Sequence, residues 1–453
     1  MGHIDPFSTL TALGAALTDG SLSSLEIVDF YLDRIERLDP AMSAFVEVQA
    51  ESARDAARAH DGLRRAGVDL GPLQGLPIAI KDLLHAKGLR CGAGSKVRAN
   101  AAPSVEDSDT IERLNQAGMI VIGRTHLVEF AFGGWGTNAA YGTPRNPWGN
   151  DTHRVPGGSS SGSGVAVGAG LCPMAIGTDT GGSVRIPSSF NGITGLKPSF
   201  GQVSNRGCIP LSTTLDSIGP MGRSIADVVL VYRALSDQVW TGAPSNGRSL
   251  AYMPESAMSP VTTPEVEAHY RQLLKELESD GWTLTPIEFP FAFDDLAAAS
   301  GDIISAEAHA YHRTTLETGS EDYGPETLKR ILNGAKLSAS DYLVRLTERD
   351  HLIRVFNEMM RPFDALILPT TPMTAIPLSD IDESRTPMSV YTRPVNYLCG
   401  CAVALPSGID SNGLPFSMQL VAPAGREESL LGLAANIEKI LAFGQVPSLA
   451  FAS

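Results

Sequence analysis

The most informative stretch of the sequence is Gly177-Thr178-Asp179-Thr180-Gly181-Gly182-Ser183-Val184-Arg185-Ile186-Pro187. An apolar run at 173–176 leads into it and predicts a buried strand that ends in a turn with two glycines. Glycines let successive backbone N–H groups point at one spot, which is what an oxyanion hole requires. A serine directly after such a turn is placed to attack a carbonyl held there. Taken alone, the stretch is either a nucleophile loop or a structural tight turn.

On both sides of this stretch, short apolar runs alternate with helical patterns. Residues 76–80 and 119–122 predict buried strands, and residues 111–117 between them predict a helix. The C-terminal half adds predicted helices and strands at 264–277, 338–360, 364–368 and 415–421. Because strands and helices alternate, the sequence predicts an α/β layer structure with a largely parallel or mixed sheet.

The first 67 residues are predicted to be helical. Ser23 and Glu26 fit a capping box, and apolar residues follow at helical spacing. Residues 51–65 predict a second helix that ends near Gly67. These helices either cover the core or form a contact between two copies of the chain, so a homodimer stays open.

Composition limits the class of protein. The 453 residues carry a formal net charge of -15, and an acidic surface repels phosphate backbones, so no nucleic-acid partner is expected. We find no apolar run long enough to span a membrane and no signal peptide, and we expect a cytoplasmic protein. The five cysteines form no C-x-x-C pair, and His309 and His312 lack a matching carboxylate pair. No metal and no cofactor are therefore expected.

Lys81 is the second feature of chemical interest. It follows the apolar run at 76–80 and precedes Asp82. A lysine in this position is either the solvated end of a strand or, if buried, an amine whose pKa is lowered by desolvation. In the second case the neutral amine can act as a base.

The third feature is the loop Gly157-Gly158-Ser159-Ser160-Ser161-Gly162-Ser163-Gly164. It presents backbone N–H groups and hydroxyls together, or it is a flexible surface loop. Ser160 is the central serine of a G-x-S-x-G pattern, but that motif needs a preceding strand, and residues 153–156 make a poor one. The dinucleotide and Walker phosphate-loop patterns do not fit.

Taken in order, these three segments resemble those of the amidase signature enzymes. The resemblance continues through the segments at 192–198, 216–221, 364–372 and 405–421, so it covers most of the chain. It implies one large α/β/α domain over residues 1–453, with helices of about 1–67 packing on it. The central mixed sheet is expected to have about ten or more strands flanked by helices.

The resemblance also implies a catalytic relay of Lys81, Ser159 and Ser183. Neutral Lys81 accepts a proton, through Ser159, from Ser183, which attacks an amide carbonyl to form an acyl-enzyme. The oxyanion is expected to be stabilised by the backbone N–H groups of Thr180, Gly181, Gly182 and Ser183. The expected supporting residues are Ser160, Asp179 and Arg185.

The resemblance places four residues beside the substrate: Phe132, Gly133, Gly134 and Trp135. Core packing is an equal interpretation for Trp135. The expected reaction converts a small carboxylic acid amide to a carboxylate and ammonia or an amine, and an ester or carbamate hydrolase fits the same relay. A noncatalytic scaffold is disfavoured because all three relay residues are present.

The alternative within the resemblance is the glutaminase subunit of a tRNA-dependent amidotransferase. Its pattern usually places an acid three residues before the threonine that matches Thr392, to help hold a glutamine. Here that position is Ser389, which weakens this alternative without removing it.

Overall fold

The computed structural model describes residues 4–149, 152–238, 240–241 and 247–450. At the centre of this described chain lies one sheet of eleven strands, in the order β1-β3-β2-β4-β6-β5-β10-β11-β9-β7-β8. The strands are β1 Phe45–Val48, β2 Pro77–Lys81, β3 Ile120–Thr125, β4 Ala175–Asp179, β5 Thr194–Lys197, β6 Ser217–Gly222, β7 Ser249–Tyr252, β8 Thr283–Pro286, β9 Ala365–Pro369, β10 Cys401–Ile409 and β11 Pro415–Ala422.

The sheet is mixed. Parallel pairing joins β2 to β3 and β4, and β7 to β8 and β9. The remaining neighbours pair antiparallel. The predicted α/β fold with a mixed sheet of ten or more strands is therefore confirmed.

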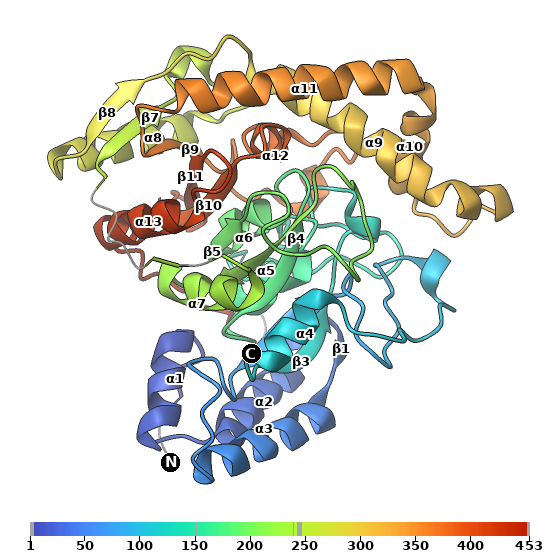
Figure 1. Cartoon of the computed structure of the whole chain (residues 1–453), viewed down its shortest axis with the longest axis vertical. Coiled ribbons are helices and arrows are strands. Elements are labelled where there is room, and N and C mark those ends of the chain that lie inside the picture. The colour runs from blue at the N-terminus through green and yellow to red at the C-terminus, as the bar shows by residue number, and fades with distance from the viewer. Residues whose placement is uncertain (1–3, 150–151, 239, 242–246, 451–453) are drawn as a thin grey trace.

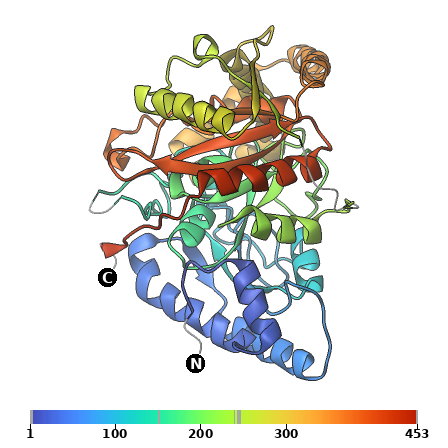
Figure 2. The ribbon, with the colours of Figure 1, turned by 90° about the vertical axis from the view of Figure 1, so that its left-hand side faces the viewer.

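Thirteen α-helices accompany the sheet in the described residues. They are α1 Leu10–Asp19, α2 Ser24–Met42, α3 Ala50–Arg65, α4 Asp109–Gln116, α5 Ser161–Gly168, α6 Arg185–Asn191, α7 Ile225–Leu235, α8 Pro264–Ser279, α9 Phe293–Thr318, α10 Pro325–Asn333, α11 Ala339–Met359, α12 Arg393–Tyr397 and α13 Glu427–Leu441. Figure 1 shows α1–α3 at one end of the molecule and α9–α11 at the other. Figure 2 shows α8 and α13 in front of the sheet, so these helices cover one of its faces. None of the described helices combines the length and the apolar character needed to span a membrane.

Strands away from the two edges of the sheet are buried on both faces. In β9, Ala365 and Ile367 belong to one apolar cluster, whereas Leu366 and Leu368 belong to another on the opposite face. Side chains alternate between the faces of a strand, so a strand covered on both sides needs a continuous apolar run. This explains why β2, β3 and β9 stand out in the sequence as short apolar segments.

The N-terminal helices pack onto the same core. The capping box at the start of α2 is confirmed: Ser23 accepts from the backbone of Glu26, and Glu26 accepts from the Ser23 N–H at 2.8 Å. Leu10 of α1 and Ile27 of α2 join the apolar cluster that contains Ile78 of β2. In the described chain these helices therefore cover the core.

Helix α5 begins inside the segment 157–164, which the sequence analysis treats as a loop. Three of its eight residues are glycine, which lowers intrinsic helix propensity. Tertiary packing overrides that propensity, because α5 lies fully buried against α6. A Cβ atom placed on Gly164 would lie 2.9 Å from Cβ of Pro187, so a glycine is required at this close approach.

Candidate active site

Lys81 is the last residue of β2 and is fully buried. Its Nζ donates to Ser159 Oγ at 2.8 Å and to Thr178 Oγ1 at 2.7 Å. Burial lowers the pKa of Lys81 to about 7, although the Asp216 and Asp179 carboxylates oppose the shift. A large fraction of this amine is therefore neutral at physiological pH and able to accept a proton.

Ser159 stands just before the start of α5, and its side chain is fully buried. The peptide bond between Gly158 and Ser159 is cis. The backbone here is held to the preceding loop, since Gly158 N donates to Gly134 O at 2.8 Å and Val128 N donates to Ser159 O at 3.1 Å. These bonds fix the hydroxyl of Ser159 beside Lys81.

Ser183 follows β4 and lines a small cavity, with 7% of its surface exposed. The N–H of Ser160 donates to the carbonyl of Ser183 at 3.2 Å, which ties the two serine loops together. In the described chain, the hydroxyls of Ser159 and Ser183 are not hydrogen-bonded to each other. The structure therefore joins Lys81 to Ser159 directly and places Ser183 alongside. Catalytic hydrogen bonds are often looser in free enzymes and tighten when substrate binds.

Ser160, the alternative nucleophile of the G-x-S-x-G pattern, has its hydroxyl engaged elsewhere. This hydroxyl accepts from the N–H of Thr178 at 3.2 Å and donates to the carbonyl of Thr178 at 3.3 Å. The side chain is fully buried. It therefore joins the start of α5 to β4 and does not face the cavity that Ser183 lines.

Asp179 and Arg185 form a buried ion pair beneath the turn. Arg185 Nε and Nη2 each lie 3.0 Å from an Asp179 oxygen, and neither side chain is exposed. Burial by itself raises the pKa of the Asp179 carboxyl, but the Arg185 charge and its hydrogen bonds more than offset this, so the pKa lies below its usual range. The carboxylate also accepts from the Asn396 side chain at 3.0 Å. The pair fixes both ends of the turn.

The N–H groups of the turn divide into two sets. Gly182 N donates to Asp179 Oδ1 at 2.7 Å, so it is directed at the carboxylate and not at the cavity. This differs from the predicted set of four oxyanion donors. In the described chain, the N–H groups of Thr180, Gly181 and Ser183 have no hydrogen-bond acceptor, and all three residues line the cavity.

Asp179→Asn is expected to lower the free energy of unfolding by about 3–5 kcal/mol, because it leaves the Arg185 cation buried without its partner charge. Urea denaturation of the two proteins measures this difference. The matched control is Asp55→Asn, which breaks an ion pair between Arg58 and Asp55 whose side chains are 55% and 77% exposed. The control is expected to leave the midpoint unchanged. Equal midpoints for wild type and Asp179→Asn would contradict this role of the buried pair.

The cavity beside Ser183 contains three of the four predicted substrate-binding residues. It is lined by Ala131, Phe132, Gly133, Gly134, Gly158, Thr180, Gly181, Ser183, Ile186, Leu211, Ile304, Thr386, Ser389 and Arg393. Trp135 instead lines a second cavity, of about 490 Å³. It belongs to a small apolar cluster, and its Nε1 donates to the carbonyls of Asp382 and Arg385 at 3.1 and 3.0 Å. Trp135 is thus both core packing and the wall of an outer cavity.

Sequence reasoning missed several residues of the site. Thr178 gives Lys81 its second hydrogen bond, and Asp216 accepts from Thr180 Oγ1 at 2.5 Å. Arg393 lines the cavity and directly follows Thr392, the threonine used above to weigh the glutaminase alternative. Thr178 lies within the quoted stretch, so proximity to Ser183 was an available signal. Asp216 begins the segment 216–221 that resembles the family, but the segment does not reveal its contact with Thr180, 36 positions away. No local pattern identifies Arg393.

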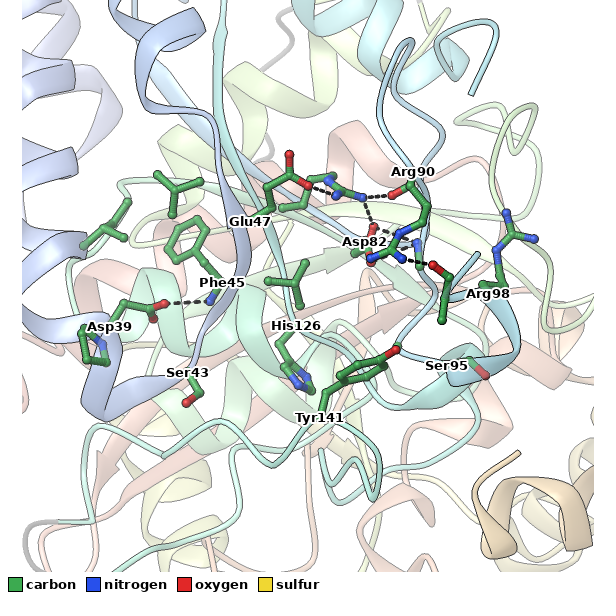
Figure 3. A pocket seen from close by; sticks show the side chains of 18 of the residues that line it. Asp39, Ser43, Phe45, Glu47, Asp82, Arg90, Ser95, Arg98, His126 and Tyr141 are labelled. Carbon is green, nitrogen blue, oxygen red and sulfur yellow. Dashed lines mark hydrogen bonds and ion pairs between the residues drawn. The ribbon is translucent and has the colours of Figure 1, made fainter. Parts of the chain in front are cut away.

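A cavity of about 580 Å³, much larger than the one beside Ser183, lies elsewhere. Figure 3 shows Asp82, Glu47 and Arg90 on one wall, with His126 and Tyr141 nearby. Arg124 joins this wall by ion pairs to Asp82 and Glu47. None of the three relay residues lines this cavity. It is therefore separate from the candidate active site, and size alone does not identify the place of the chemistry.

Of the two histidines considered in the sequence, His312 has contacts that fit a structural role. His312 of α9 is buried, its Nδ1 lies 2.9 Å from the Tyr323 hydroxyl, and its ring packs edge-on against Phe130. Burial lowers its pKa to about 4. The described residues contain no cluster of His, Cys, Asp and Glu side chains suited to a metal ion.

Comparison with known proteins assigns the chain to a family. Residues 26–431 match the Amidase family. The chain is 35% identical to a glutamyl-tRNA(Gln) amidotransferase subunit of Symbiobacterium thermophilum, over 93% of this chain and 94% of that protein. The chain therefore belongs to the amidase signature family of hydrolases.

Solved structures agree with this assignment. A crystal structure of an amidase superposes with a TM-score of 0.89 at 30% identity, covering 95% of this chain and 99% of the other. The native peptide amidase from Stenotrophomonas maltophilia superposes with a TM-score of 0.82 at 26% identity, covering 98% and 99%. The resemblance inferred from the sequence is confirmed at the level of family and fold.

Proposed function

We propose that this protein hydrolyses the C–N bond of a carboxylic acid amide through an acyl-enzyme on Ser183, with Lys81 as base and Ser159 as the bridge between them. One observation carries the proposal: a fully buried lysine whose pKa is lowered to about 7 contacts Ser159 beside the cavity that Ser183 lines. A surface lysine would stay protonated and could not take up a proton.

The reaction then proceeds in two halves. The Ser183 oxygen bonds to the amide carbon while its proton passes through Ser159 to Lys81, and the oxyanion accepts from N–H groups of Thr180, Gly181 or Ser183. The C–N bond breaks, and the relay returns the proton to the leaving nitrogen. Water next attacks the acyl carbon and gives a proton to the relay. The relay reprotonates Ser183 as the carboxylic acid leaves.

Asp216 and Thr180 support the oxyanion side of the turn. Asp216 accepts from Thr180 Oγ1 and from the N–H groups of Leu211 and Ser212, at 2.9 and 3.1 Å. This network anchors Thr180, so the turn is held by Asp216 as well as by Asp179. Donors held in place before the reaction stabilise a developing charge without a reorganisation cost.

A second candidate function is the glutaminase activity of an amidotransferase subunit. The relatives favour it, since the glutamyl-tRNA(Gln) amidotransferase subunits of Symbiobacterium thermophilum and of Synechococcus sp. strain CC9605 are 35% and 34% identical to this chain. Ser389 argues against it, because this residue offers no charge for a glutamine α-amino group.

Two measurements separate these candidates. The first compares ammonia release from glutamine with release from primary amides, aryl amides, esters and carbamates by the purified chain. The second is affinity purification of the tagged chain from its own host. Amide hydrolysis by the chain alone supports the proposal. Glutamine hydrolysis that appears only with co-purified subunits would instead support the second candidate, and faster turnover of matched esters would identify an esterase.

A further inference from the structure

Arg393 is the only charged residue among those described around the cavity beside Ser183. Its stem crosses the nucleophile turn: a Cβ atom placed on Gly181 would lie 2.8 Å from Arg393 Cγ and 3.4 Å from its Nε. A side chain at position 181 would therefore displace the arginine. At the far end of the side chain, Arg393 Nη1 lies 3.7 Å from the position that a Cβ atom on Gly301 of α9 would occupy. The guanidinium thus lies between the turn and α9.

The backbone that carries Arg393 is held firmly. Thr392 Oγ1 donates to the carbonyl of Gly181 at 2.8 Å, and Arg185 Nη2 donates to the carbonyl of Thr392 at 3.0 Å. One residue earlier, Gln419 Nε2 donates to the carbonyl of Tyr391 at 2.9 Å. Arg393 is therefore fixed to the same turn that carries Ser183, which is what a precise binding group requires.

Within the described chain, Arg393 forms neither an ion pair nor a hydrogen bond. Burial and, to a smaller extent, the charge of Arg330 lower its pKa to about 10, with no carboxylate acting in the opposite direction. Arg185 differs, because its guanidinium forms an ion pair with Asp179 at 3.0 Å. Arg393 is half-buried, so its cation is partly desolvated while the guanidinium stays accessible to a ligand, and a bound anion would supply the missing counter-charge.

A ligand can reach this group from outside. The cavity beside Ser183 measures only about 30 Å³, but Arg393 also lines two outer cavities of about 490 and 450 Å³. Thr386 lines all three as well. Arg393 therefore stands where the outer space meets the nucleophile turn.

We propose that Arg393 determines substrate specificity by binding a carboxylate on the acyl portion of the amide that Ser183 attacks. The planar donor fork of a guanidinium matches the two oxygens of a carboxylate. The substrate class is then the half-amides of dicarboxylic acids. This inference rests on the hydrolase function proposed above and deepens it.

The same cavity argues against an amino acid amide as the preferred substrate. Its described lining contains no Asp or Glu, and Ser389 donates its hydroxyl to the carbonyl of Thr386 at 2.8 Å. In this inner cavity an α-ammonium group would have no counter-charge and would lie close to the Arg393 cation, since carboxylates such as Asp302 and Asp382 line the outer cavities. Glutaramate, which is glutamine without its amino group, should therefore be preferred to glutamine.

The first test measures kcat/KM for malonamate, succinamate and glutaramate against propanamide, butanamide and pentanamide. At least one anionic amide is expected to exceed its neutral analogue by about 10²-fold. In Arg393→Met this ratio should fall to about 1, and in Arg393→Lys it should be intermediate, because the charge stays but the fork is lost. Arg313→Met, which removes an exposed cation on α9, is the matched control and should keep the wild-type ratio.

Two results would overturn the inference: a wild-type ratio near 1, or an equal loss on both substrates in Arg393→Met. The second result would mean that the cation acts on the oxyanion and not on a substrate carboxylate.

A second test needs no turnover. Malonate, succinate and glutarate are titrated by calorimetry into Ser183→Ala and into the double variant Ser183→Ala with Arg393→Met. At least one should bind about 10²-fold more weakly to the double variant. Such binding without hydrolysis of any amide by the wild type would support the anion site and refute the hydrolase function. Absent or unchanged dicarboxylate binding would refute the anion site alone.

Discussion

Ser183→Ala is expected to lower kcat/KM for the best amide substrate by about 10⁴-fold or more, because it removes the oxygen that forms the acyl-enzyme. The substitution removes one oxygen from a side chain that is already small, so the unfolding midpoint should stay close to that of the wild type. Initial rates over a range of enzyme concentrations measure the loss. A fluorophosphonate probe reports the nucleophile directly, since it should label the wild type and not the variant.

The matched control is Ser160→Ala, the central serine of the G-x-S-x-G pattern. Its hydroxyl is bonded to both backbone groups of Thr178 and lies away from the cavity. This variant should still be labelled, and mass spectrometry should place the probe on the peptide that contains Ser183. Labelling that survives in Ser183→Ala, or that maps to Ser160, would refute the proposed nucleophile.

The strands of the sheet were the part of the fold most open to prediction. Segments such as β2 and β9 are short, apolar and buried on both faces, so the sequence marks them without reference to the rest of the chain. The order of the strands was not open to prediction in the same way. Strand β5 pairs with β10, about two hundred residues later, and β4 pairs with β6 instead of β5. Such pairings depend on how distant segments pack, which local periodicity does not record.

The residues of the site likewise fall into those that local sequence identifies and those that it does not. The glycine turn before Ser183 can be recognised in the sequence, because glycines followed by a serine are typical of backbone N–H donors placed beside a nucleophile. The contact between Lys81 and Ser159 joins residues 78 positions apart and followed from family resemblance, not from spacing. The missing partner of Arg393 could not be foreseen, since it depends on which side chains are absent from its surroundings. The N–H of Gly182 was assigned to the oxyanion because the sequence does not reveal that Asp179 turns back to accept from it.

Lys81→Met is expected to lower kcat/KM by about 10³-fold or more through kcat, with little change in KM, because it removes the base and leaves the cavity intact. Methionine has a similar length and no charge, so it fits a fully buried position without the desolvation cost that lysine bears there. The unfolding midpoint of the variant should therefore not fall, and a denaturant titration checks this. A large loss of stability would mean that the lost activity reports misfolding.

The pH profile distinguishes a base from a purely structural lysine. Desolvation lowers the pKa of Lys81 from 10.5 to about 7, and the active form is the neutral amine. Protonation below that pKa removes the base, so kcat/KM of the wild type should rise with pH, pass its midpoint near 7 and level off above it. Lys81→Met should retain a weak activity whose pH profile lacks this rising limb. Full wild-type activity well below neutrality, or a limb that persists in the variant, would show that another group accepts the proton from Ser159.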